Sequence, residues 1–316
     1  MNLNLKKQSP WIQLVIFGVI TMVLAFMSTL AGAYILASYS HISLADLAKL
    51  QPADFAKPEY ASLAKGLLVV QFFGIFLLPS LLFAWLADSR PLSFCGIRKP
   101  QIPHAIWLAA IVMLCAYFMV EWFAVVNQQI VQHFFGKAAQ KWIQDAETDR
   151  NGTLQNILNM KNPRDLLVSL ILVGLLAAIG EEIFFRGILQ RIFIQTFKSP
   201  WVGILVTAAI FSAVHGQFLG FLPRMILGAV LGALYWYSGS LITAMVGHFV
   251  FNAIQVFLVY FKLVDTNQNN SGGNFLLLAG IPALIIVAFL LNYMRKRSTT
   301  TYEEIYYTPE TIFPGE

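Results

Sequence analysis

Long apolar runs separated by short polar segments recur from one end of the chain to the other. An α-helix rises about 1.5 Å per residue, so about 20 apolar residues cross the roughly 30 Å hydrocarbon core of a bilayer. The pattern therefore predicts an all-α fold, a polytopic membrane helix bundle of about eight transmembrane helices. The expected spans are Trp11–Ala37, Gly66–Ala87, Ala105–Val126, Asp165–Phe193, Trp201–Leu219, Arg224–Tyr237, Leu241–Phe261 and Phe275–Tyr293.

The composition of the chain agrees with this pattern. Of its 316 residues, 58% are hydrophobic and only 12% are charged, whereas a soluble domain carries about 25% charged residues. The net charge of +5 fits contact with anionic membrane lipids, and no basic-aromatic cluster suggests a nucleic-acid partner. We expect an integral multi-pass protein of a bacterial plasma (inner) membrane that contacts lipids and no nucleic acid.

The basic residues predict how the helices are oriented, because loops retained in the cytoplasm are enriched in Lys and Arg. They gather at alternate ends of the spans, which places both the N and the C terminus in the cytoplasm. The longer polar segments 38–65 and 127–164, whose charges are mixed, then lie outside. The basic residues on the predicted cytoplasmic side are Lys6, Lys7, Arg90, Arg98, Lys99, Arg191, Lys198, Arg295, Lys296 and Arg297.

The first span has to be distinguished from a cleaved signal peptide, since it follows two lysines. Its apolar stretch of roughly 26 residues is too long for a signal-peptide core of about 7–15 residues. We expect an uncleaved membrane anchor. The chain then divides into residues 1–164, with three spans and two extracytoplasmic loops; residues 165–261, with spans four to seven; and residues 262–316, with the final span and a cytoplasmic tail.

Ionisable residues inside the spans are the candidates for function. A charge at the centre of a bilayer costs roughly 2.5–3.5 kcal/mol on insertion scales, so such residues usually face a protein interior or a water-filled cavity. Glu121 and Arg224 lie near predicted outer helix ends, where a long side chain reaches the interface, and we interpret them as structural. Cys95 and Cys115 have no metal-ligand or redox spacing and are expected to be buried thiols.

The fourth span carries the sequence "EEIFFR" at residues 181–186. Its start is marked by Asn162 as a candidate N-cap followed by proline at the first helical position. Glu182 and Arg186 are four residues apart on one helix face, so we expect them to form an ion pair. Glu181 lies about 100° around the helix from Glu182 and is available for another role.

Two further spans carry polar residues at helical spacing. "FSAVH", residues 211–215, places His215 one turn after Phe211, an aromatic residue that can line a pocket, and "HFVFN", residues 248–252, places His248 and Asn252 on one face. Counting helix rise from the predicted cytoplasmic ends gives overlapping depths for Glu181 and both histidines. We expect one shared cavity, open to the cytoplasmic half of the membrane.

Such a cavity has the groups needed to hydrolyse an amide. A carboxylate and an imidazole around one water form a general base, and a second imidazole with an amide NH2 group can donate to a developing oxyanion. No serine or cysteine lies in a recognisable nucleophile motif, so the residues favour direct attack by water over a covalent intermediate.

The three sequences resemble the motifs E-E-x-x-x-R, F-x-x-x-H and H-x-x-x-N of the CAAX protease and bacteriocin-processing (CPBP) family of intramembrane endopeptidases. The resemblance covers about residues 165–260. It implies that Glu181 and His215 activate the water and that His248 and Asn252 stabilise the oxyanion. It further implies a supporting role for Glu182 and Arg186.

The family includes enzymes that cleave prenylated CAAX proteins and bacterial members tied to bacteriocin maturation, self-immunity or protein anchoring. The resemblance therefore implies a hydrophobic or lipidated protein or peptide substrate. Family members have been described both as metalloproteases and as metal-independent glutamyl proteases. We expect no metal cofactor; the alternative is zinc bound by Glu181, His215 and His248, although H-E-x-x-H is absent from the sequence.

Two other functional classes remain open at this point. A non-catalytic membrane scaffold or a bacteriocin-immunity protein would keep the fold without turnover. A proton-coupled transporter would use the same buried ionisable groups as a relay, but its usual signs are paired repeats or broken helices about the midplane, and the sequence suggests neither.

Overall fold

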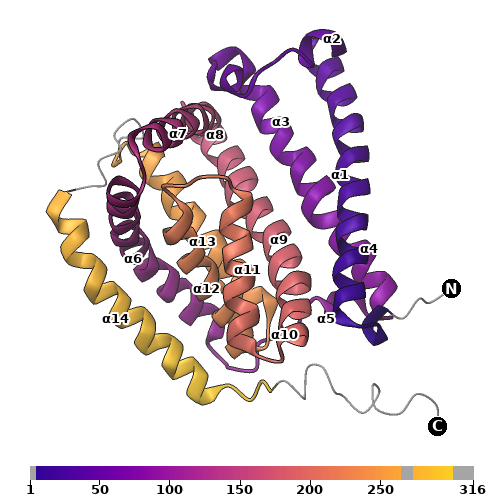
Figure 1. Ribbon diagram of the computed structural model, residues 1–316, viewed down its shortest axis with the longest axis vertical. Coiled ribbons are helices and arrows are strands. Elements are labelled where there is room, and N and C mark those ends of the chain that lie inside the picture. The colour runs from indigo at the N-terminus through magenta and orange to yellow at the C-terminus, as the bar shows by residue number, and fades with distance from the viewer. Residues whose placement is uncertain (1–4, 265–272, 302–316) are drawn as a thin grey trace.

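The computed structural model describes residues 5–264 and 273–301, without the side chains of residues 149 and 273–277. The predicted all-α class is confirmed for these residues, since every regular element in them is a helix (Figure 1). The expected cytoplasmic tail lies outside them beyond residue 301.

The 3-10 turns are η1 (Leu5–Lys7), η2 (Pro52–Ala56) and η3 (Pro58–Tyr60), and the π-helical segments are η4 (Phe72–Leu77), η5 (Leu170–Leu176) and η6 (Ile183–Gln190). The α-helices are α1 (Pro10–Ser40), α2 (Leu44–Leu47), α3 (Ala61–Gln71), α4 (Leu78–Ala87), α5 (Pro91–Phe94), α6 (Ala105–Phe134), α7 (Lys137–Ile157), α8 (Pro163–Ser169), α9 (Ala177–Glu182), α10 (Arg191–Phe197), α11 (Pro200–Val214), α12 (Phe221–Ser238), α13 (Leu241–Tyr260) and α14 (Gly273–Arg297).

Six helical stretches in the described part of the chain are long and apolar enough to cross a membrane, and each coincides with a predicted span. The predicted fifth and sixth spans form the shorter α11 and α12, of 15 and 18 residues. At about 1.5 Å per residue, α11 is shorter than the hydrocarbon core is thick, so a full crossing by these two helices stays a prediction. The six stretches are Pro10–Ser40, Pro58–Ala87, Ala105–Phe134, Pro163–Phe197, Leu241–Tyr260 and Leu278–Arg297.

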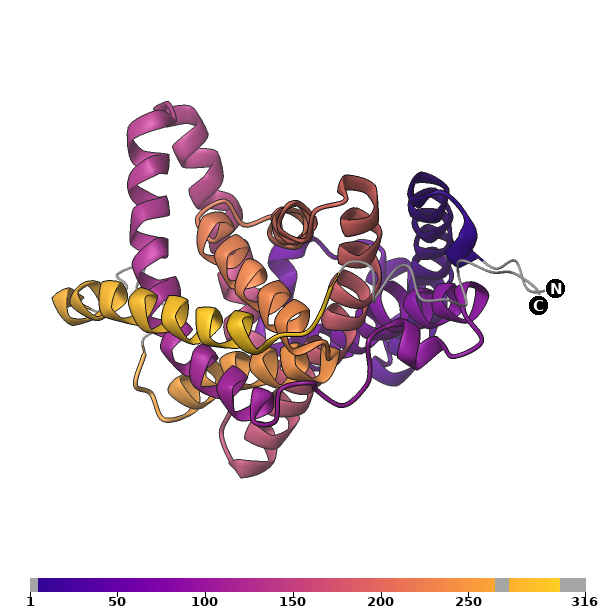
Figure 2. The ribbon, with the colours of Figure 1, turned by 90° about the horizontal axis from the view of Figure 1, so that it is seen from below.

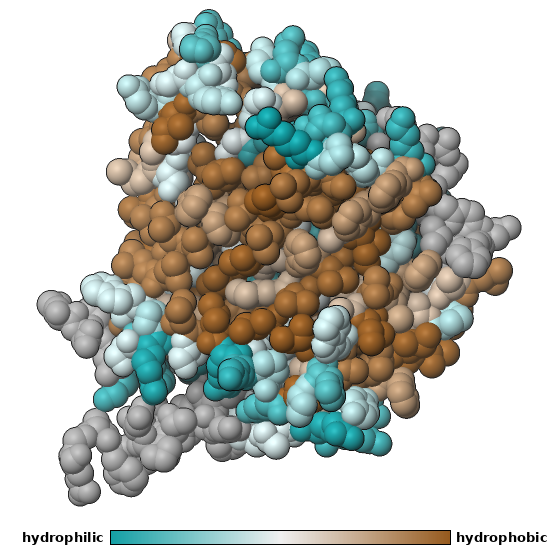
Figure 3. All heavy atoms as spheres, turned by 180° about the vertical axis from the view of Figure 1, so that it is seen from behind, coloured by the Kyte–Doolittle hydropathy of each residue, from teal (hydrophilic) through white to brown (hydrophobic). Residues whose placement is uncertain are grey.

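The surface of the molecule is that of an integral membrane protein. Seen from behind, apolar side chains form a broad band across the middle, and hydrophilic residues gather at both ends (Figure 3). Large apolar side chains on α1, such as Met22 and Phe26, are more than half exposed. In water such exposure would be costly, whereas in a bilayer these side chains contact lipid tails.

Several helices begin at the same local sequence, a polar cap followed by proline. Ser9, Asn162 and Ser199 each accept a hydrogen bond from a backbone N–H of the first turn, and a proline occupies the next position. The proline needs no hydrogen-bond acceptor there, and its fixed φ suits the helix. The predicted start of the fourth span at Asn162 is therefore confirmed.

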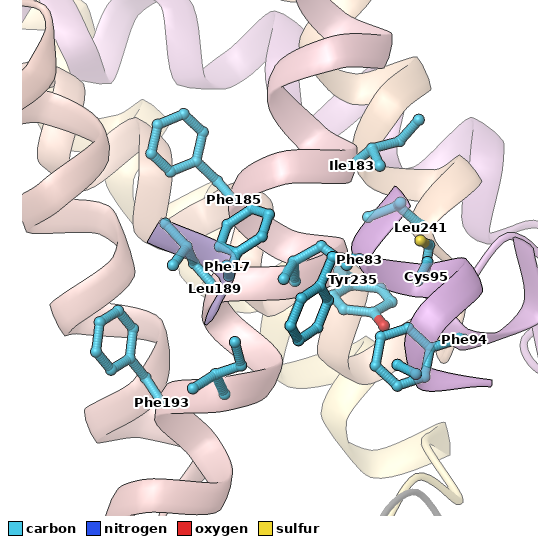
Figure 4. Close-up of a cluster of buried hydrophobic side chains, with 14 of the residues drawn as sticks. Phe17, Phe83, Phe94, Cys95, Ile183, Phe185, Leu189, Phe193, Tyr235 and Leu241 are labelled. Carbon is cyan, nitrogen blue, oxygen red and sulfur yellow. The ribbon is translucent and has the colours of Figure 1, made fainter. Parts of the chain in front are cut away.

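The first helix is part of the bundle. Phe17 of α1 is buried against Phe83 of α4, with ring centroids 5.3 Å apart, and its ring also contacts Phe184 of η6, 4.8 Å away. Figure 4 shows Phe17 and Phe83 together with Phe185, Tyr235 and other buried side chains in one cluster. Removing α1 would expose this cluster, which supports the interpretation of the first span as a retained anchor.

The fourth span lies at the centre of the fold and alternates between α- and π-helical segments. α9 and η6 contact α11, α12, α13, α4 and η4. α1 and α14 lie at opposite edges of the molecule, as the two perpendicular views show (Figures 1 and 2). α1 begins and α14 ends toward the same end of the molecule, and α7 lies toward the other (Figure 1). The side of the membrane that each end faces stays a prediction.

Candidate active site

The carboxylate of Glu182 is the centre of a buried polar cluster. Its Oε1 accepts hydrogen bonds from Arg186 Nη1 and from His248 Nδ1, both at 2.8 Å. The side chains of Glu182 and Arg186 are 0% exposed and that of His248 is 4% exposed. The predicted Glu182–Arg186 ion pair is confirmed, whereas the contact with His248 was not foreseen from the sequence.

His248 lies between the two carboxylates of the fourth span. While Nδ1 donates to Glu182, Nε2 lies 3.9 Å from Glu181 Oε2. The side chain of Glu181 is 13% exposed, against 0% for that of Glu182. Glu181 is therefore the carboxylate that solvent can reach, and Glu182 is the one that orients the imidazole.

His215 caps the C-terminal end of α11, where its side chain is held by its own helix. Its Nδ1 lies 2.7 Å from the carbonyl oxygen of Phe211. A carbonyl oxygen only accepts, so Nδ1 carries the proton and Nε2 of the neutral ring keeps its lone pair. Because His215 is half-buried, this lone pair can accept a hydrogen bond from a water molecule.

The ring of Phe211 contacts His215, His248 and Arg186. Its ring centroid lies 5.0 Å from that of His215 and 6.2 Å from that of His248, in edge-on geometry. The Arg186 guanidinium carbon lies 4.6 Å from the same centroid, at a distance typical of a cation–π contact. The structure thus brings the three sequence motifs together around one buried aromatic side chain.

The side-chain amide of Asn252 has a hydrogen-bond partner outside the cluster around Glu182. Its Nδ2 donates to the carbonyl oxygen of Val173 at 2.9 Å, which connects α13 to η5. An amide NH2 group has two protons, so one remains for another acceptor. The structure places Asn252 one turn beyond His248, and its role toward an oxyanion stays a prediction.

Gly228 and Gly232, spaced as G-x-x-x-G on α12, let α11 and the fourth span approach this helix closely. A Cβ at Gly228 would lie 3.2 Å from the Cβ of Ala208. The exposed backbone carbonyls also serve as acceptors: Arg186 Nη2 donates to Gly228 O at 3.0 Å, and Gln190 Nε2 donates to Gly232 O at 3.3 Å. The sequence did not predict this second use of the glycines.

The loop after His215, residues 216–220, is held by hydrogen bonds to side chains that the sequence analysis did not identify. Asn127 of α6 donates to the carbonyl oxygens of Phe218 and Leu219, at 2.7 and 2.9 Å, and Glu147 Oε1 of α7 accepts from Leu219 N at 3.0 Å. Asn127 and Glu147 are both buried. Asn127 is the first residue of the predicted polar segment 127–164, where an amide carries no particular signal.

These contacts bear on the expected direction of the cavity, which stays a prediction. The sequence analysis placed the opening of the cavity in the cytoplasmic half of the membrane. His215, however, lies at the end of α11, and the loop that follows it contacts α6 and α7. By the charge rule, α7 belongs to the extracytoplasmic side. The depth count located side chains along each helix without showing which loops lie next to them.

The alternative zinc site does not fit the side chains as they lie. Among the described residues, no group of three or more His, Cys, Asp or Glu side chains is arranged to hold a metal ion. The Nδ1 atoms of His215 and His248 are engaged by Phe211 O and by Glu182, which leaves the Nε2 atom of each ring free. Because Glu181, His215 and His248 are not arranged as a ligand set, we derive no step through a metal.

The cysteines were expected to be buried thiols, which holds fully for Cys95 and in part for Cys115. Burial raises the pKa of the Cys95 thiol to about 12, although the nearby charge of Arg191 opposes the shift. A thiol with so high a pKa is a poor nucleophile near neutral pH, because the thiolate is the reactive form.

Comparison with known proteins identifies the central part of the chain. Residues 163–254 match the family described as type II CAAX prenyl endopeptidase Rce1-like, which confirms, for this segment, the family expected from the three motifs. The match covers less than a third of the 316 residues. It supports an intramembrane endopeptidase in general terms.

Two bacterial proteins of unassigned function are similar to this chain. The uncharacterized protein YpbD of Bacillus subtilis (strain 168) is 26% identical over 133 residues, which cover 42% of this chain and 66% of that protein. An uncharacterized 24.3 kDa protein of Escherichia coli is 28% identical over 92 residues, 28% of this chain and 42% of that protein. The chain thus spans just under two thirds of the first relative and less than half of the second. No solved structure matches the chain.

Proposed function

We propose that this protein is an intramembrane endopeptidase of a bacterial plasma membrane. Its substrate is a hydrophobic or lipidated protein or peptide, cleaved near the membrane by direct attack of water. The observation that carries this proposal is the position of Glu181, a solvent-reachable carboxylate 3.9 Å from an imidazole that a second, fully buried carboxylate orients. The family match over residues 163–254 supports it.

The general base in this proposal is formed by Glu181 and His215. Nε2 of His215 has a lone pair because Nδ1 donates to Phe211 O. A water between this nitrogen and the Glu181 carboxylate loses a proton to the pair, and its oxygen attacks the carbonyl carbon of the scissile bond. The same proton then passes to the nitrogen of the leaving amine, so the products are a carboxylate and an amine.

Stabilisation of the oxyanion is the role proposed for His248 and Asn252. Nδ1 of His248 donates to Glu182, so Nε2 becomes a donor only when the ring is an imidazolium. Asn252 can add its second amide proton, while the first remains on Val173 O.

Substitution of the general base tests the proposal. In a cleavage assay with purified protein and a hydrophobic, lipidated peptide, Glu181→Gln and His215→Ala should each reduce kcat by at least about 10²-fold, because each removes a proton acceptor from the attack step. Glu121→Gln makes the same chemical change on α6, and Cys115→Ala removes a thiol; both should keep the parental rate.

Two outcomes would count against the proposal. Cleavage by Glu181→Gln at the parental rate would remove the enzyme assignment, and a parental protein without cleavage would favour a scaffold or immunity role. A chelator added to the same assay tests the zinc alternative, since a loss of activity restored by Zn²⁺ would show metal dependence.

A further inference from the structure

The reactive groups of the candidate active site are almost covered in this structure. Nε2 of His248 and Oε2 of Glu181 are 3.9 Å apart, and these two side chains are 4% and 13% exposed. The proposed reaction places both a water molecule and a substrate carbonyl beside these atoms, each at a hydrogen-bond distance of about 2.7–3.2 Å. A peptide does not reach groups so well covered, so part of the protein has to move before a substrate binds.

The helices that carry these groups are firmly joined to one another. Glu182 of α9 accepts a hydrogen bond from His248 of α13, and Arg186 of η6 donates to Gly228 O of α12. Both hydrogen bonds are buried and involve ionisable side chains, which are costly to leave without a partner. Separating these helices is therefore the expensive way to open the site.

The loop 216–220 is held more weakly and lies beside the site. Gln217 of this loop accepts from Arg224, which is close enough to act electrostatically on Glu181. The sequence analysis interpreted Arg224 as reaching the membrane interface, but the structure turns it toward the loop. None of the five loop residues is buried, and a glycine stands at each end, with Gly216 in the left-handed region at φ +61°. Short exposed segments of this kind open more readily than packed helices.

Helix α7 closes this loop from the outside. Glu147 Oε1 accepts from Leu219 N at 3.0 Å, and Asn127 of α6 donates to two carbonyl oxygens of the same loop. α7 is itself attached elsewhere, because Asn156 donates to the carbonyl oxygens of Phe55 and of the residue that follows η2, at 2.9 and 2.6 Å. The loop can therefore move away while α7 stays in place.

The edge between the loop and α7 is aromatic and faces outward. Trp142 of α7 and Phe218 of the loop lie with their ring centroids 5.2 Å apart, and they are 59% and 42% exposed. Aromatic side chains at a membrane–water interface contact both apolar and polar groups. Such an edge suits a hydrophobic peptide that approaches along the membrane surface.

We propose that loop 216–220 is a flap over the candidate active site and that Glu147 is its latch, so that a hydrophobic peptide enters between the flap and α7. This inference rests on the proposed function and adds an entry route to it. Glu147 precedes the segment 163–254 that matches the family, so the latch is supplied by a part of the chain outside that segment. A weaker latch exposes His215 more often.

Chemical modification of His215 measures flap opening without any turnover. Diethyl pyrocarbonate reacts with uncharged imidazole, and Nε2 of His215 keeps its lone pair because Nδ1 donates to Phe211 O. Glu147→Ala removes the latch and should raise the modification rate of His215 by about tenfold, as expected for the loss of a hydrogen bond to a carboxylate. Glu147→Gln keeps a carbonyl oxygen for Leu219 N and should raise the rate less.

The matched control is Asp145→Asn, which changes an exposed carboxylate of α7 to an amide. It should leave the modification rate of His215 unchanged, and the exposed His133 serves as an internal reference in every variant. Thermal melts show whether each variant is folded. An unchanged rate at His215 in folded Glu147→Ala would overturn the inference.

A reversible cross-link tests the entry route. Glu147→Cys and Leu219→Cys, joined by a short bis-methanethiosulfonate in a Cys115→Ala background, hold the flap shut. The linked protein should cleave the peptide at least about tenfold more slowly, because a shut flap keeps the substrate out. Its modification at His215 should also slow, and a reductant should restore both rates to those of the unlinked protein.

The control pair is Gly152→Cys with Ala56→Cys, since a Cβ at Gly152 would lie 2.8 Å from the Cβ of Ala56. This link only ties α7 to η2 and should change neither rate. Cleavage at the unlinked rate by the linked flap, with the link confirmed by mass spectrometry, would overturn the entry route. If no variant cleaves the peptide while modification of His215 follows the latch and the link, the proposed function fails and the flap stands. The reverse outcome removes the flap alone.

Discussion

Glu182 shows how one residue can serve both the fold and the chemistry. Its Oε1 accepts from Arg186 and from His248. Burying a lone carboxylate in this environment would be costly. The ion pair with Arg186 offsets that cost. The contact with His248 fixes which imidazole nitrogen faces Glu181. In the proposed mechanism, the two adjacent glutamates therefore have separate tasks, which follow from their different exposure.

Glu182→Gln tests this double role. The substitution keeps the size of the side chain but leaves the Arg186 guanidinium buried without its counter-charge, so the free energy of unfolding should fall by about 3–5 kcal/mol. Denaturant or thermal unfolding in detergent measures the change. Glu121→Gln, the same substitution on α6, should cost much less. A Glu182→Gln protein as stable as the parent would show that the ion pair contributes nothing to the fold.

At the scale of elements, the approach of α12 to η6 and α11 depends on two glycines. A Cβ at Gly232 would lie 2.6 Å from Gln190 Oε1 and 2.9 Å from Ile204 Cγ2. Both distances are too short for a real contact, so a larger residue pushes α12 away. The carbonyls of Gly228 and Gly232 would then lose the Arg186 and Gln190 donors.

Gly232→Ala should therefore destabilise the protein by about 1–3 kcal/mol, the usual cost of overpacking. Gly18→Ala on α1 is the matched control, since no atom lies within 4 Å of a Cβ built there. That change should stabilise the helix by up to about 1 kcal/mol, because alanine has the higher helix propensity. Thermal melts of the two variants compare them directly, and equal melting temperatures would contradict the packing argument.

At the scale of the whole molecule, the orientation in the membrane decides from which side the site is approached. The loop after His215 is held by α6 and α7, and Arg150 and Arg224 lie around it. The basic residues predict that α7 lies outside the cell and the end of α14 inside. On that prediction, a substrate reaches the candidate site from the extracytoplasmic side.

Cysteine labelling measures this orientation. In a Cys115→Ala background, an impermeant maleimide added to intact cells should label Lys141→Cys on α7 but not Lys296→Cys on α14, both at exposed positions. The native Cys95 can stay, because burial raises its pKa to about 12 and leaves almost no thiolate at pH 7.5. The reverse pattern of labelling would invert the predicted topology.

Much of this protein was determined by its sequence alone. Helix class, six spans, the start of the fourth span at Asn162 and the Glu182–Arg186 pair all follow from periodicity and spacing, because they depend on neighbours within one helix. The motifs also identified Phe211, His215, His248 and Asn252 as candidates. Their proposed roles are untested.

Only the tertiary structure decided how groups from different helices meet. The contact of His248 with Glu182 and the donation of Asn252 to Val173 join residues that are 66 and 79 positions apart in the chain, and folding alone brings them together. Spacing along one helix specifies a face and a depth, but it does not specify the rotation of that helix against its neighbours. That rotation is set by packing, here by the glycines of α12 and the ring of Phe211, and it determines which nitrogen of His248 is free, whereas His215 is held by a carbonyl of its own helix.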